Sequence, residues 1–204
     1  MRLYLVRHGQ TESNRRGLAL GRADVPLNEI GRSQAARLAE ALAAEPLKAV
    51  YSSPLQRALD TARPIAARHG LEVQVDAGLI EMDIGELDGL AFADVRERYP
   101  GLLESWLGRD GPGQPMPGGE RLVDVQERSW RAIEAIAERH PDEAVCAVTH
   151  NFVILSALAR ALGMDLADFR RVRHAVAAIS ILDFRADRVR VVSINDTCHL
   201  GPEG

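Results

Sequence analysis

The chain has 204 residues, of which 46% are hydrophobic and 26% are charged, and its formal net charge at pH 7 is −4. This length predicts a single domain over 1–204, and the acidic excess together with an aromatic content of 4% excludes a general nucleic-acid surface. All the basic residues except Lys48 are arginines, which suit local, bidentate binding of an anion.

The sequence predicts a cytoplasmic protein. No apolar run approaches the roughly 18 residues of a membrane span, and no basic-then-apolar leader precedes the first predicted strand. Cys146 and Cys198 are interpreted as reduced thiols rather than as a disulfide or a metal site. We therefore expect neither a membrane partner nor a nucleic-acid partner.

The first half of the chain alternates short apolar runs with amphipathic stretches, which predicts strands and helices in turn. Asn28 is placed to cap a helix, and Ser53-Pro54 is a typical N-cap and first-turn pair for the helix that carries Arg57. Pro64 is expected to kink or offset that helix. The expected elements are a strand at 3–6, a loop at 14–28, a helix at 28–45, a strand at 49–52, a helix from 53 to 70 and a strand at 72–75.

The second half begins with a polar, glycine-rich loop at 78–90. Residues 108–119 contain three prolines, and we interpret the segment at about 90–119 as an excursion over the surface of the one domain. The other expected elements are helices at 91–99, 120–140 and 152–162, and strands at 144–148, 177–184 and 188–194. This alternation predicts an α/β fold, a three-layer α/β/α sandwich whose mostly parallel sheet has helices on both faces.

Residues able to handle a phosphate follow several of the predicted strands. Arg7 and His8 follow the first, Arg57 comes just after the second, and His150 follows the strand at 144–148. Taken alone, Arg7-His8 would be an ordinary surface pair at a strand end. Because the carboxyl ends of parallel strands share one edge of a sheet, the recurrence of the pattern predicts a site there.

These residue types suit phosphoryl transfer. Arginines bind a tetrahedral dianion, one neutral imidazole can attack phosphorus, and the second can donate to the equatorial oxygens. Asn14 and Glu81 are available from loops at the same edge. A carboxyl group there can protonate the leaving oxygen, and a bound dianion would favour the protonated form of Glu81.

A metal site is the rival interpretation of two histidines and a carboxylate. Arg7 and Arg57 would repel a divalent cation, and metal-ligand spacings such as His-x-x-x-His are absent from the sequence. A P-loop and a Gly-x-Gly-x-x-Gly fingerprint are absent too. We therefore expect no metal and no cofactor.

Several ordered motifs of the chain resemble the histidine phosphatase superfamily, also called the cofactor-dependent phosphoglycerate mutase-like family. They cover most of the length: LVRHGQTESN at 5–14, DVPLNEIG at 24–31, YSSPLQRALDTA at 51–62, EMDIGELDG at 81–89, PGGE at 117–120, VTHN at 148–151 and NDTCHL at 195–200. The resemblance implies a parallel-dominated sheet flanked by helices. It also implies that His8 is the phosphohistidine nucleophile and Glu81 the acid and later base. The phosphate pocket that it implies is formed by Arg7, Asn14, Arg57 and His150.

Within that family the choice lies between hydrolysis and mutase chemistry. Mutases carry a longer segment after the Glu81 loop, with basic residues that grip a substrate carboxylate. Here the segment is short, and Arg96 and Arg98 are interpreted as solvated side chains. We therefore predict a metal-independent phosphatase of a small phosphorylated metabolite, with a phosphoglycerate mutase-type transferase as the alternative. A catalytically silent binding module would be expected to lack the site residues, which are all present.

Some positions depart from the family pattern. Leu20 stands where Gln or Thr is common before Gly21, Arg121 replaces a common serine, and Asn151 replaces a glycine after His150. Leu20 either contacts substrate or packs within its loop, and Asn151 can cap the following helix. We include Leu20, Gly21 and Asn151 among the expected substrate-binding positions.

Two further features have more than one interpretation. His174 precedes the late strand pair, and it either faces the pocket or is structural. The segment LLESWLGRD at 102–110, with Phe92 nearby, is either an apolar lid over the site, a core element or a contact in a homodimer.

Overall fold

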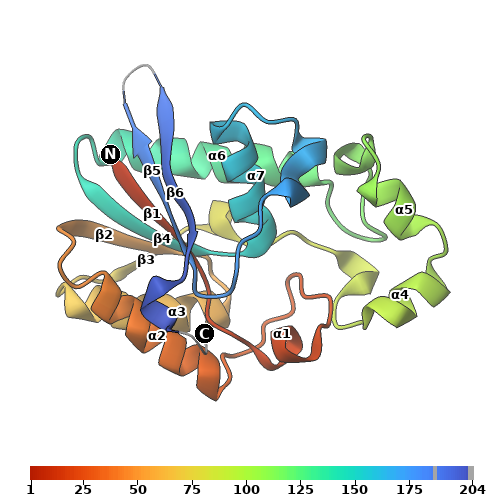
Figure 1. Ribbon diagram of the computed structural model, residues 1–204, viewed down its shortest axis with the longest axis horizontal. Helices are drawn as coiled ribbons and strands as arrows, with labels where there is room; N and C mark the ends of the chain where they lie inside the picture. The colour runs from red at the N-terminus through yellow and green to blue at the C-terminus, as the bar shows by residue number, and fades with distance from the viewer. Residues whose placement is uncertain (186–187, 202–204) are drawn as a thin grey trace.

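A computed structural model describes residues 1–185 and 188–201 of the chain (Figure 1). The described residues form one six-stranded sheet with the strand order β3-β2-β4-β1-β5-β6. The strands are β1 (Arg2–Arg7), β2 (Leu47–Ser52), β3 (Val73–Val75), β4 (Ala144–Thr149), β5 (Ile179–Phe184) and β6 (Val189–Asp196). The α-helices are α1 (Glu12–Arg16), α2 (Glu29–Ala41), α3 (Gln56–Arg68), α4 (Phe92–Arg98), α5 (Leu102–Leu107), α6 (Leu122–Arg139) and α7 (Asn151–Ala161).

The sheet is mostly parallel, as predicted, and becomes antiparallel toward one edge. β1 pairs with β4, β4 with β2, and β2 with β3, all in parallel. The two late strands, β5 and β6, add antiparallel pairings to β1 and to each other. The carboxyl ends of β1, β2 and β4 therefore lie at one edge of the sheet.

Helices cover both faces of the sheet, which confirms the expected three layers (Figure 1). In β1, Tyr4 and Val6 pack on one face with α2 and α3, and Leu3 and Leu5 pack on the other with α6 and α7. Side chains alternate between the faces of a strand, and a strand buried on both faces is apolar throughout. This explains why β1 and β4 are continuous apolar runs in the sequence.

The segment between residues 90 and 119 contains the short helices α4 and α5, which lie beyond the sheet on the right of Figure 1. The sequence analysis predicted the first of these helices but not the second. Val95 and Trp106 anchor the segment in a third apolar cluster with residues of the 82–87 loop, α6 and α7. The segment thus forms a wall next to the carboxyl edge of the sheet.

Three local predictions were wrong. The loop predicted at 14–28 begins inside α1, which runs to Arg16. In the capping box of this helix, the Thr11 and Asn14 side chains each accept a hydrogen bond from the other residue's backbone amide. Ser53 does not cap α3, because that helix starts at Gln56 after Leu55. Helix α2 ends at Ala41, earlier than the predicted end near residue 45. Pro64 lies within α3, which runs unbroken to Arg68.

No helix in the described part of the chain is long and apolar enough to cross a membrane.

A contact between two glycines fixes the loop that follows β1. A Cβ atom on Gly31, in the first turn of α2, would lie 2.0 Å from the Gln10 carbonyl oxygen, and one on Gly9 would lie 2.6 Å from the Gly31 carbonyl oxygen. The Gln10 carbonyl also accepts a hydrogen bond from the Asn28 amide at 3.0 Å. Only residues without side chains allow α2 to approach the loop this closely.

We predict that Gly31→Ala destabilises the protein by about 3 kcal/mol, because the new methyl group must push backbone away from backbone. The matched control is Gly113→Ala, since nothing lies within 4 Å of a Cβ atom at that position. The control should change the free energy of unfolding by less than about 1 kcal/mol. Urea denaturation measures both values, and equal stability of the two variants would contradict the proposed close packing.

Candidate active site

His8 and His150 are brought together by the register of two neighbouring strands. β1 and β4 pair in parallel as far as Arg7 and Thr149, so each histidine is the next residue after a paired one. The His8 amide donates a hydrogen bond to the Thr149 carbonyl at 3.0 Å. The two imidazole ring centroids are 5.1 Å apart. Both rings are buried at the carboxyl edge of the sheet.

The His8 ring is oriented by the carbonyl of the next residue. His8 Nδ1 lies 2.7 Å from the Gly9 carbonyl oxygen, which can only accept, so Nδ1 carries the proton and Nε2 keeps its lone pair. Burial, with the charges of Arg57 and Arg7, lowers the pKa of His8 well below its ordinary value. His8 is therefore a neutral imidazole, and its Nε2 is available as a nucleophile.

The His150 ring is held by a serine that follows β2. The Ser53 amide donates to the Val148 carbonyl, and the Ser53 hydroxyl lies 2.6 Å from His150 Nε2. His150 Nδ1 is buried and has no partner among the described residues. Burial, followed by the charge of Arg57, lowers the pKa of His150 as well. Ser53 was misread in the sequence as a helix cap, although it stands in one of the quoted motifs.

Arg57 is buried and Arg7 is half-buried, and neither forms a salt bridge to a carboxylate in the described part of the chain. Arg57 is 0% exposed and donates to the carbonyls of Gly21 and Ala23 at 2.6 and 2.8 Å. Arg7 donates to the carbonyl of His174 at 2.5 Å. The Nε atom of each arginine is buried and has no partner among the described residues. Burial lowers the pKa of Arg7 to about 10, so it stays charged at neutral pH.

Glu81 reaches the same place from the loop after η1 (Ala77–Leu79). Its carboxylate oxygens accept from the Met82 amide at 2.8 Å and from the Phe152 amide at 3.4 Å. Burial raises the pKa of Glu81, and the Met82 amide and the arginine charges oppose the shift. A buried carboxyl group with a raised pKa beside two arginines suits proton transfer.

A network that was not predicted from the sequence holds the backbone of the Glu81 loop. The Arg128 guanidinium donates to the carbonyls of Gly78, Ile80 and Glu81 at 2.9, 2.7 and 3.0 Å. It also bonds to Glu120, whose carboxylate accepts from the Asp83 amide. Glu120 belongs to the quoted PGGE motif, but no sequence signal pointed to Arg128. The network positions Glu81 without touching its carboxyl group.

The remaining predicted residues take different places. The Asn14 side chain accepts from the Thr11 amide at 3.1 Å as part of the α1 cap. Gly21 is buried, and a Cβ atom there would lie 2.6 Å from Ile84 Cγ1, so its role is to bring its carbonyl to Arg57. Leu20 is half-buried in the same loop. Asn151 does not cap α7, because it is the first residue of that helix.

A cleft with a volume of about 610 Å³ opens beside the two histidines, and we call it the aromatic cleft. Its lining includes Arg7 of the candidate site, Asn151, which follows His150, and His174, whose carbonyl accepts from Arg7. Its aromatic residues are Phe92, Trp106, Phe152 and Phe169, and its other arginines are Arg96, Arg170 and Arg173. His174 therefore lines the cleft, and so does the segment that carries Trp106.

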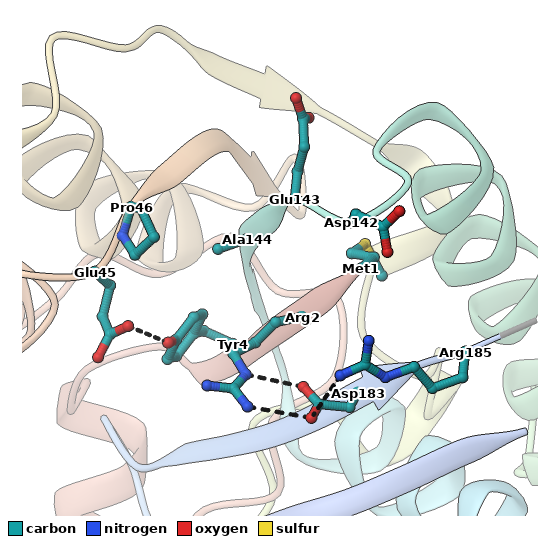
Figure 2. A pocket seen from close by; sticks show the side chains of 10 residues that line it. All are labelled: Met1, Arg2, Tyr4, Glu45, Pro46, Asp142, Glu143, Ala144, Asp183 and Arg185. Atoms are coloured by element: carbon teal, nitrogen blue, oxygen red, sulfur yellow. Dashed lines mark hydrogen bonds and ion pairs between the residues drawn. The ribbon is translucent and has the colours of Figure 1, made fainter.

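Another cavity, of about 350 Å³, lies at the opposite, amino-terminal edge of the sheet (Figure 2). Its charged side chains bind one another, as Arg2 donates to Asp183 at 2.8 and 3.1 Å and Tyr4 donates to Glu45. This cavity contains none of the residues that the sequence singled out. Among the described residues, no group of three or more His, Cys, Asp or Glu side chains could hold a metal ion.

Comparison with known proteins assigns the chain to a family. The sequence profile of the histidine phosphatase superfamily (branch 1) matches residues 3–197. The chain belongs to this superfamily. It is 34% identical to phosphoserine phosphatase 1 of Hydrogenobacter thermophilus over 201 residues, which are 98% of this chain and 95% of the relative. It is 35% identical to a glucosyl-3-phosphoglycerate phosphatase of Mycobacterium tuberculosis, over 82% of this chain and 78% of the relative.

Solved structures of the superfamily have the same fold. The protein YhfR of Bacillus stearothermophilus superposes with a TM-score of 0.91 at 30% identity, over 98% of each chain. A mycobacterial glucosyl-3-phosphoglycerate phosphatase in complex with VO3 superposes with a TM-score of 0.88 at 32% identity, over 96% of this chain and 99% of that one. Some relatives are longer, and the chain spans 55% of a bifunctional Mycobacterium tuberculosis protein that is 39% identical to it.

The site geometry predicts which tautomer of His8 is present. In long-range ¹H–¹⁵N NMR spectra at pH 7, Nδ1 of His8 should show the protonated shift and Nε2 the unprotonated one, with the signals assigned by their loss in His8→Ala. Because burial and the arginine charges hold the pKa of His8 well below its ordinary value, the neutral ring persists as the pH falls, and the pattern should be unchanged at pH 6. Protonation of His8 with a midpoint near 6.5, or a proton on Nε2 at pH 7, would refute this electrostatic account.

Proposed function

We propose that the protein is a metal-independent phosphatase that hydrolyses the phosphate monoester of a small metabolite through a phosphohistidine at His8. The observation that carries this proposal is the pairing of Arg57, which is buried, with Arg7, whose Nε atom is buried. Neither forms a salt bridge among the described residues, and the charges of both act on the neutral His8 imidazole. Buried cationic groups without a salt bridge are costly unless an anion joins them. A phosphate dianion offers oxygens to both guanidinium groups.

In the first step, His8 Nε2 attacks phosphorus and the ester P–O bond breaks. The Glu81 carboxyl group gives its proton to the leaving alkoxide, so the product departs as a neutral alcohol. The Gly9 carbonyl accepts from Nδ1–H and stabilises the positive charge that the imidazole gains. Arg7, Arg57 and His150 bind the phosphoryl oxygens, and Asn14 adds a further donor at the edge of this pocket.

In the second step, water attacks the phosphorus of the phosphohistidine. The Glu81 carboxylate accepts a proton from this water, the P–N bond breaks, and His8 returns to its neutral state as inorganic phosphate leaves. Glu81 recovers the proton that it gave in the first step, so the cycle is balanced. The two steps need no metal, because the arginines supply the positive charge.

The relatives support hydrolysis rather than transfer. Two of the relatives compared above are named as phosphatases, one of phosphoserine and one of glucosyl-3-phosphoglycerate. One solved mycobacterial relative is a complex with inorganic phosphate. We extend to this chain the common feature of those names, a small organic molecule that carries a phosphate ester. The free thiols of Cys146 and Cys198 agree with a cytoplasmic location for such an enzyme.

The proposal predicts release of nitrophenol from para-nitrophenyl phosphate in the presence of EDTA. His8→Ala should lower kcat/KM by at least about 10³-fold, because the nucleophile is lost. The control is His69→Ala, since His69 ends α3 away from the site, and its activity should stay within about twofold of wild type. Loss of activity in EDTA, or activity retained by His8→Ala, would overturn the proposal.

Glu81→Gln tests the acid, with hydrolysis of each ester followed by the release of inorganic phosphate. For an alkyl phosphate, whose leaving group needs a proton, kcat/KM should fall roughly 10²-fold or more. For para-nitrophenyl phosphate, whose leaving group is stable as an anion, the fall should be less than about tenfold. An equal loss on the two esters would mean that Glu81 does not protonate the leaving group.

A further inference from the structure

The aromatic cleft is placed to receive the part of the substrate that is not phosphate. It is lined by Arg7, which belongs to the phosphate site, and by Asn151, which follows His150 in the chain, so a molecule bound by its phosphate to Arg7 can extend into it. Inference about its occupant therefore rests on the proposed function of the site. The chemistry of the residues that line the cleft then indicates which kind of leaving alcohol it can bind.

One wall of the cleft is apolar and built from rings. Trp106 meets Phe152 and Phe169 edge to face, with ring centroids 5.6 and 5.5 Å away. Phe92 on α4 and Leu107 on α5 are 53% and 45% exposed, so the wall continues onto apolar side chains that other parts of the protein leave uncovered. Such a surface gains free energy when an apolar group covers it.

The cleft is also positively charged. Among the described residues that line it, none is acidic, and Arg96 and Arg173 form neither a hydrogen bond nor an ion pair through their side chains. Arg170 differs, because it donates to the Leu107 carbonyl at 2.9 Å and lies over the Phe169 ring. The guanidinium groups of Arg96 and Arg173 are thus free to bind a second anionic group of the substrate.

We propose that the aromatic cleft selects a phosphate monoester whose alcohol has an apolar, ring-bearing body and a second anionic group. The ring packs on Phe92 and Trp106, and Arg96 and Arg173 bind the anionic group. Phosphoserine, named for one relative, has a carboxylate but no apolar body. We therefore expect this protein to prefer a ring-bearing phosphate monoester over phosphoserine.

Four esters separate the two features of this substrate class. They are propyl phosphate with neither feature, 3-phenylpropyl phosphate with the ring, O-phospholactate with the carboxylate, and O-phospho-3-phenyllactate with both. Wild-type kcat/KM should be highest for O-phospho-3-phenyllactate, by about tenfold or more over O-phospholactate. The comparison between variants and wild type on each ester cancels differences in intrinsic reactivity.

Substitutions should remove the two preferences separately. Arg96→Gln and Arg173→Gln should each lower kcat/KM for O-phospho-3-phenyllactate about tenfold and leave 3-phenylpropyl phosphate within about twofold of wild type. Phe92→Ala should lower the two ring-bearing esters and spare the other two. The matched control is Arg98→Gln, because Arg98 lies on α4 with Arg96 but does not line the cleft. It should change none of the four.

A binding measurement keeps this test independent of turnover. Titration calorimetry with the His8→Ala protein should show O-phospho-3-phenyllactate binding about tenfold more tightly than O-phospholactate. In that background, Arg173→Gln should remove the difference in Kd between O-phospho-3-phenyllactate and 3-phenylpropyl phosphate. Equal Kd values for all four esters would overturn the assignment of the cleft even if wild type hydrolyses them. Preferential binding without hydrolysis by wild type would leave the cleft assignment standing and overturn the proposed function.

Discussion

The central constraint on this structure is that Arg57, which is buried, and Arg7, whose Nε atom is buried, form no salt bridge in the part of the chain that is described. Buried cationic groups without a salt bridge are costly, and here backbone carbonyls of Gly21, Ala23 and His174 offset part of that cost. Their charge also reaches the neighbouring acids and bases. It reinforces the effect of burial on the imidazole pKa of His8, and it opposes the effect of burial on the carboxyl pKa of Glu81. A bound dianion would offset the charge of the two arginines and so weaken their effect on the pKa of His8 and on the pKa of Glu81.

The phosphate site and the aromatic cleft are built by different parts of the fold. The histidines follow strands of the buried sheet, where the register of β1 and β4 leaves little freedom. The cleft is walled by short helices α4 and α5, which are anchored by an apolar cluster of their own. The proposed function therefore allows substrate choice to change in the segment at 90–119 while the proposed chemistry at His8 is retained. This division fits a superfamily whose members are named for different phosphate esters.

Much of this arrangement was predictable from the sequence because it depends on strand ends. Apolar runs located β1, β2 and β4, and parallel pairing then placed His8 and His150 at one edge. The role of Ser53 was not predictable, because a serine before proline has the pattern of a helix cap and only tertiary structure brings its hydroxyl to His150. Arg128 was not predicted for a similar reason. It is a half-buried residue among exposed charges on α6, and its bonds to the Glu81 loop are formed across the fold. The cleft likewise depends on how α4 and α5 pack, which local patterns do not determine.

The account depends most directly on transfer of the phosphoryl group to His8. Rapid-quench mixing with a ³²P-labelled monoester, stopped in base, should give a burst of protein-bound label. That label should survive base, be lost in acid and map to the peptide that contains His8, because a phosphoryl group on an imidazole nitrogen is acid-labile. Label that is stable to acid, or that maps to a peptide without His8, would contradict the central claim.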